Sequence, residues 1–236
     1  MIQAFLDNPN LLLTEFNEMA RIAQSKSFIT IGVELQKDEI NTLELYRGDL
    51  AELKKQFVER NQEPEANLVY CIDAILRVMQ YELEMLVNIK EDKMAEAWGN
   101  LANAQTILPT AIRNLPFEEK SLYNYVVKLT NYERLLFPKL YFSSVGGIIK
   151  KSECSICHQD PNLCDHLKGK LYMGELCLTL ISEMELEEVS FVDNPANKHC
   201  RIMTIEHDEK TIDILTLREV EKKSNRKVDK HSLPLE

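Results

Sequence analysis

Residues 153–169, Glu-Cys-Ser-Ile-Cys-His-Gln-Asp-Pro-Asn-Leu-Cys-Asp-His-Leu-Lys-Gly, place three cysteines and two histidines in one short segment. Cys154 and Cys157 form a Cys-x2-Cys pair on one tight turn, and Cys164 and His166 follow a proline-containing loop. Thiolate and imidazole are the ligands that tetrahedral Zn²⁺ prefers, and four of them leave no open position. We therefore predict a structural zinc ion bound by Cys154, Cys157, Cys164 and His166.

The ligand set has alternatives nearby in the sequence: His158, Cys177, His199 and Cys200. Five of the six cysteines fall between positions 154 and 200, and Cys71 stands alone. Close cysteines and histidines in a reducing compartment indicate metal ligands more readily than disulfides. Because Cys177 lies in the strand-like stretch Leu-Cys-Leu-Thr-Leu, we expect it to be a small buried apolar residue.

The N-terminal part has the apolar periodicity of helices. The spacing predicts helices over 11–24, 38–60, from Pro64 to beyond position 86, from 94 to Pro109, where the helix kinks or ends, and over 118–136. Apolar residues recur there every three or four positions, which is typical of helices that pack against one another. We therefore predict a helical bundle over 1–137.

From position 138 the pattern changes to short β-type runs separated by turn residues. We expect strands over 140–145, 176–181, 188–192 and 201–205, with turns at Gly146-Gly147 and Asp193-Asn194-Pro195. An amphipathic helix is expected from position 211, followed by a polar tail to 236. The fold class is α+β: an all-helical N-terminal bundle (1–137), a small zinc-stabilised β-rich module (138–210) and a helical tail (211–236).

Composition excludes some classes of function. With 44% apolar residues the chain can bury a core, and a net charge of −10 with a pI near 5.1 gives no general attraction to nucleic acid or anionic membranes. The N-terminus has no basic segment followed by a long apolar run, so neither a signal peptide nor a membrane span is expected. We expect a cytoplasmic protein.

Three phrases together resemble the C-terminal part of the prohead (capsid maturation) proteases of tailed phages. They are Phe-Ser-Ser-Val-Gly-Gly-Ile-Ile-Lys-Lys (142–151), the zinc segment through Gly-Lys-Leu-Tyr-Met-Gly-Glu-Leu-Cys (169–177), and Glu-Leu-Glu-Glu-Val-Ser-Phe-Val-Asp-Asn-Pro-Ala-Asn (185–197). The resemblance covers a quarter of the chain and implies a serine nucleophile at Ser144, with Ser143 a near alternative, and an acidic partner at Glu188.

In that family the general base is a histidine upstream of the serine, whereas the first histidine of this chain is His158. A hydroxyl without a positioned base is no stronger a nucleophile than any surface serine. We therefore expect a non-catalytic, zinc-stabilised protein-interaction or adaptor protein in a phage, prophage or phage-defence setting. The alternatives are a prohead-type serine protease and a zinc knuckle that binds nucleic acid through Lys150, Lys151, Lys168 and Lys170. No residue names the protein partner or the oligomeric state.

Overall fold

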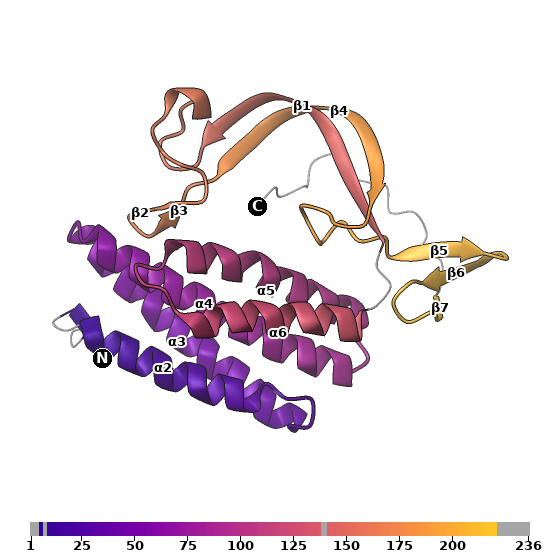
Figure 1. Cartoon of the computed structure of the whole chain (residues 1–236), viewed down its shortest axis with the longest axis horizontal. Helices are drawn as coiled ribbons and strands as arrows, with labels where there is room; N and C mark the ends of the chain where they lie inside the picture. Colours follow the sequence, from indigo (N-terminus) through magenta and orange to yellow (C-terminus); the bar gives the residue numbers. More distant parts are fainter. Residues whose placement is uncertain (1–4, 7–8, 138–140, 221–236) are drawn as a thin grey trace. The chain divides into compact units, whose positions relative to one another are not determined.

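The computed structural model describes residues 5–6, 9–137 and 141–220 and has the predicted α+β architecture, with helices followed by small antiparallel sheets (Figure 1). The chain forms two compact units. The first contains Met1–Leu136 and Leu167–Cys177, and the second contains Phe137–His166 and Leu178–Glu236. The expected polar tail over 221–236 lies outside the described residues.

The helical unit is built from five long helices within the described residues: α2 (Pro9–Lys26), α3 (Val33–Glu59), α4 (Glu63–Lys90), α5 (Met94–Asn114) and α6 (Lys120–Leu136). The predicted apolar stripes form its core. Leu43, Leu50 and Phe57 of α3 and Ile72 and Leu86 of α4 are all buried. Helix α4 is therefore buried along most of its length, because it packs against α2, α3 and α5.

Two helix boundaries differ from the sequence prediction by five residues. Helix α3 begins at Val33, five residues before the expected start, with Gly32 as its N-cap residue. Helix α5 does not end at Pro109 but continues to Asn114 with the proline inside. Proline removes one helix hydrogen bond. Packing of Leu108 and Ala111, both fully buried, holds the last turn in place.

A short hairpin from the C-terminal half packs with the helices. Strands β2 (Leu171–Tyr172) and β3 (Glu175–Leu176) are joined by a turn in which Met173 and Gly174 both have positive φ. The amide of Gly174 donates to Asn67 Oδ1 at 2.7 Å, and Asn114 Nδ2 donates to the Gly169 carbonyl at 2.9 Å. The β-rich module predicted over 138–210 includes residues 167–177. Side-chain amides on α4 and α5 instead satisfy the hairpin's backbone groups.

The second unit is dominated by a long antiparallel ribbon of β1 (Phe142–Cys154) and β4 (Thr179–Val192) (Figure 1). Gly146-Gly147 is not a turn, which corrects the sequence prediction. A Cβ on Gly147 would collide with the Glu185 carbonyl oxygen, and the register shifts between the two glycines. The glycines of β1 therefore allow close strand approach at a β-bulge whose extra residue, Glu187, lies in β4.

A small three-stranded sheet follows the ribbon: β5 (Thr204–His207), β6 (Lys210–Asp213) and β7 (Glu219–Val220). The prediction of a helix from position 211 is therefore wrong. Asp208 and Glu209 form a two-residue turn in which both φ angles are positive, the geometry that joins twisted antiparallel strands. Pairing of β6 with β5 and β7 thus overrides the helical spacing of its apolar residues.

Candidate metal centre

The four predicted ligands sit on a knuckle that begins where β1 ends. Cys154 is the last residue of β1, and its amide donates to the Gln159 carbonyl while its carbonyl accepts from the His158 amide, both at 2.9 Å. His158 reverses the chain with a φ of 57°. The one-turn 3-10 helix η1 (Pro161–Leu163), capped by the Asp160 carboxylate, then brings the chain back to Cys164.

The donor atoms of Cys154, Cys157, Cys164 and His166 all lie within 4.8 Å of one another. His166 Nδ1 is 3.6 Å from Cys164 Sγ. Around a tetrahedral Zn²⁺, ligand bonds of about 2.3 Å to sulfur and about 2.0 Å to nitrogen separate those two atoms by about 3.5 Å. The four residues are therefore positioned to bind one metal ion, and their donor atoms suit zinc.

Two backbone amides support the ligand sulfurs. The Ile156 amide donates to Cys154 Sγ at 3.4 Å, and the His166 amide donates to Cys164 Sγ at 3.3 Å. Such hydrogen bonds orient a ligand thiolate and reduce its negative charge. These two donors are not among the residues predicted for the site, although the short Cys-x2-Cys and Cys-x-His spacings are the signal that brings an amide next to each sulfur.

The thiols crowd one another enough to affect their ionisation. The hydrogen bond from the His166 amide lowers the pKa of Cys164. Burial and the neighbouring Cys154 and Cys157 side chains raise that pKa by a larger amount, so it lies at about 11, above the usual value of 9.0. Three thiolates at this spacing repel one another. A divalent cation would remove that repulsion, so the cluster has the electrostatics of a metal site.

The structure places the alternative ligands outside the cluster. His158 Nδ1 lies 3.1 Å from the Glu153 carboxylate, and Cys177 is buried in the helical unit, at the end of the β2–β3 hairpin. Cys200 and His199 follow the bend after β4 and are not among the clustered donors in the described part of the chain. Cys177 is thus the small buried residue that its apolar neighbours predicted.

Ser144 and Glu188 lie on the β1–β4 ribbon, near the end where β1 begins and β4 finishes. Ser144 pairs across the strands with Ser190, and the Glu188 side chain lies beside Gly146. The Ser144–Ser190 and Gly146–Glu188 pairs are two positions apart, so Ser144 and Glu188 lie on the same face. Across the described residues, no hydrogen bond joins Ser144 to a histidine. The near alternative, Ser143, donates to the Cys200 carbonyl at 3.4 Å.

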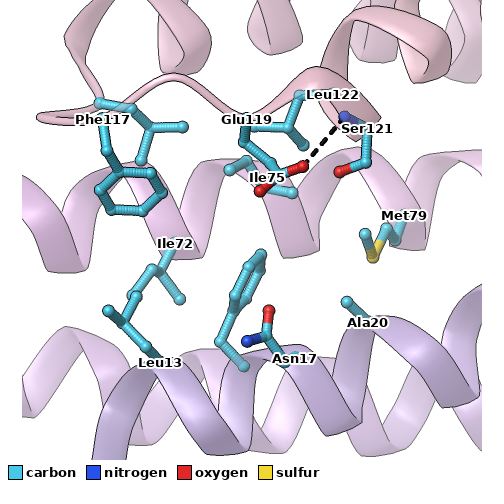
Figure 2. A pocket seen from close by; sticks show the side chains of 12 residues that line it. Leu13, Asn17, Ala20, Ile72, Ile75, Met79, Phe117, Glu119, Ser121 and Leu122 are labelled. Atoms are coloured by element: carbon cyan, nitrogen blue, oxygen red, sulfur yellow. Dashed lines mark hydrogen bonds between the residues drawn. The ribbon is translucent and has the colours of Figure 1, made fainter. Parts of the chain in front are cut away.

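The helical unit contains a separate cavity of about 380 Å³ (Figure 2). Its walls are mostly apolar: Leu13 and Ala20 come from α2, and Ile72 and Met79 from α4. Glu119 is the one ionisable side chain among the lining residues, and its carboxylate accepts from the Ser121 amide at the start of α6. These residues provide neither a nucleophile with a base nor a metal-ligand set.

Comparisons with known proteins gave no family assignment. No protein-family model matches the chain, and searches of curated protein sequences and of solved structures returned no match. Within the described residues, no helix has the length and apolar character needed to cross a bilayer.

Proposed function

We propose that this chain is a non-catalytic protein-interaction or adaptor protein whose β-rich unit is stabilised by a structural zinc ion. The observation that carries the proposal is the quartet of Cys154, Cys157, Cys164 and His166, whose donor atoms all lie within 4.8 Å of one another. A zinc ion with four protein ligands has no position for an activated water, so it stabilises a fold and does not hydrolyse a substrate. The resemblance to prohead proteases supports a phage, prophage or phage-defence setting.

The closed site is tested by metal content and by cobalt substitution. We expect one zinc per chain by elemental analysis. The Co²⁺-substituted protein should show the strong visible absorption of a tetrahedral thiolate site, unchanged by added azide or cyanide. A spectrum that shifts on binding either anion would reveal an open coordination position and would overturn the structural role.

Two histidine variants test the ligand assignment, one at a predicted ligand and one at a neighbouring histidine. His166→Ala removes one of four ligands and should weaken zinc affinity at least tenfold. His158→Gly replaces a non-glycine residue at positive φ and should leave the zinc content and affinity unchanged. Competition with a chromophoric chelator measures both affinities. If His158→Gly weakened zinc affinity and His166→Ala did not, His158 would be the ligand in place of His166.

The serine protease alternative makes a distinct prediction at Ser144. We expect a fluorophosphonate probe to leave Ser144 unlabelled, because no described histidine reaches its hydroxyl to accept a proton. Stoichiometric labelling that disappears in Ser144→Ala would instead support proteolysis. Mass mapping of the labelled peptide separates Ser144 from Ser143.

The nucleic-acid alternative requires free basic side chains near the metal centre. Lys150 is paired with Glu185 at 2.8 Å on the ribbon, and the chain carries a net charge of −10. We therefore expect no gel shift with single-stranded or duplex nucleic acid. A shift that weakens steeply with salt would revive this alternative.

A further inference from the structure

The cavity of the helical unit has the size of a small-molecule site. Its volume is about 380 Å³, and all of its lining residues belong to the first unit. Ligand pockets commonly enclose about 300–1,000 Å³, and an apolar cavity of about 150 Å³ already holds a benzene molecule. The space between α2, α4 and the α5–α6 connection is therefore large enough for an apolar body of about two rings.

The walls of this cavity are aromatic and aliphatic. Phe16 of α2 and Phe117 of the α5–α6 connection line it together with Ile72, Ile75 and Met79 of α4. The three α4 side chains are buried, whereas Phe117 is 44% exposed, so the cavity has an apolar floor and opens to solvent beside the connection. An apolar ligand that enters it removes its own surface and that of the floor from water.

Two polar side chains extend from opposite walls, Glu119 from the α5–α6 connection and Asn17 from α2 (Figure 2). The Ser121 amide donates to Glu119 Oε1 at 3.1 Å and lowers the pKa of this carboxyl, so Glu119 is ionised at neutral pH. A carboxylate has about four acceptor positions, and this hydrogen bond uses one of them. Glu119 therefore offers a negative charge and further acceptor positions to a ligand.

We propose that this cavity binds a small amphipathic amine, whose apolar body fills the space between α2 and α4 and whose protonated nitrogen pairs with Glu119 and donates to Asn17. Charge complementarity selects this class of ligand. A carboxylate ligand would be repelled by Glu119 and would meet no cation among the described lining residues. A neutral apolar ligand would remove part of the hydration of Glu119 without replacing it.

The other side of the α5–α6 connection does not neutralise this charge. Arg113 and Glu118 line a second hollow there together with Glu119, so the one cation stands against two carboxylates. The Arg113 guanidinium lies beside Gly169 of the segment that leads into the β2–β3 hairpin. Within the described residues it forms no ion pair with either carboxylate. Glu119 thus remains available to a cationic ligand.

The test uses three probes that share a naphthalene ring and differ in the group attached to it: 1-naphthylmethylamine, 1-naphthalenemethanol and 1-naphthaleneacetate. Isothermal titration calorimetry on the zinc-loaded, full-length protein measures their dissociation constants at neutral pH. The amine should bind about fivefold more tightly than the alcohol, because an ion pair is added to the same ring contacts. The carboxylate should bind most weakly of the three.

Three variants locate the binding. Glu119→Gln keeps the size of the side chain and removes its charge, so it should abolish the preference for the amine and leave the affinity for the alcohol unchanged. Glu118→Gln changes the adjacent carboxylate, which does not line the cavity, and should leave all three affinities unchanged. Ala20→Phe fills the cavity from α2 and should weaken the binding of every probe about tenfold.

Circular dichroism and zinc content are measured on every variant. No binding of the amine at millimolar concentration, equal affinities for the three probes, or an amine preference that survives Glu119→Gln would overturn the inference. Probe affinities unchanged in a folded Ala20→Phe protein would place the binding elsewhere and would also overturn it. The inference concerns the helical unit alone, so its failure would leave the proposed zinc-stabilised function standing.

Discussion

Glu82 is the most completely buried carboxylate described in the helical unit. Its side chain has no exposed area, and Lys128 Nζ lies 2.6 Å from its Oε1 as an ion pair without hydrogen-bond geometry. Tyr125 and Gln24 donate to the other oxygen at 2.7 and 3.1 Å. A buried charge is tolerated only with such partners, so this group fixes how α2, α4 and α6 meet.

Lys128→Met should destabilise the helical unit by about 3 kcal/mol, because it leaves Glu82 charged and buried without a counter-ion. The control is Lys210→Met, which removes an exposed pair with Glu219 and should cost about 0.5 kcal/mol or less. Urea unfolding followed by circular dichroism compares the two variants. Equal, small losses would show that Tyr125 and Gln24 suffice to hold the carboxylate.

Glu91, after the end of α4, gives a pH-dependent contribution to stability. Hydrogen bonds from Lys37 and Lys93, at 2.7 and 2.6 Å, lower its pKa from 4.5 to about 2. Because the folded pKa is below the unfolded value, this contribution is present above pH 4.5 and is lost as the pH falls toward about 2.

We therefore expect Glu91→Gln to reduce the dependence of the unfolding free energy on pH over that range. Unfolding in urea at a series of pH values measures it. Lys37→Met and Lys93→Met should each remove part of the same dependence, since each retains one partner. A Glu91→Gln protein with the wild-type pH profile would contradict the assignment.

At the scale of elements, the ribbon depends on Gly147, a glycine whose sequence context predicts a turn. A Cβ at Gly147 would meet the Glu185 carbonyl oxygen, so Gly147→Ala should force the strands apart at the bulge, at a cost of about 1–3 kcal/mol. Gly99→Ala in α5 meets nothing within 4 Å and should stabilise its helix by about 0.5–1 kcal/mol.

Hydrogen exchange distinguishes these effects by location. Gly147→Ala should speed exchange of the amides of β1 and β4 and leave α5 unchanged, whereas Gly99→Ala should slow exchange in α5 alone. Normal protection of the ribbon in Gly147→Ala would mean that the bulge relaxes without cost.

At the scale of the whole molecule, the chain passes between its two units on both sides of the β2–β3 hairpin. His166 is the last residue of one segment of the second unit, and Leu167 begins the hairpin segment of the first. Lys54 donates to the Gly174 carbonyl at 3.0 Å and pairs with Glu175 at 2.9 Å, in addition to the contacts of Asn67 and Asn114. The hairpin therefore has its own anchors, independent of the metal ligands.

Removing the metal should accordingly unfold only part of the C-terminal half. After chelation we expect faster hydrogen exchange across 154–166 and the adjoining ribbon, because a structural zinc ion supplies much of the folding free energy of a small site. The helices and residues 167–177 should keep their protection. Loss of protection in 167–177 together with the knuckle would show that the hairpin depends on zinc.

The sequence by itself determined the features that depend on local spacing. Apolar residues at three- and four-residue steps identified the helices, and Cys-x2-Cys followed by Cys-x-His identified donors that the structure brings together. Both patterns work locally: a helix closes its hydrogen bonds within four residues, and the knuckle closes its loop within 13 residues.

Only the tertiary structure decided the features that depend on pairing between distant segments. Gly147 is a close-approach residue because Glu185 lies opposite it, and residues 210–213 form a strand because 204–207 and 219–220 pair with them. Asn67 and Asn114 hold a hairpin more than 50 positions away along the chain. Local spacing does not encode such partners, because the backbone groups of a strand or hairpin form hydrogen bonds with segments that can be distant in the sequence.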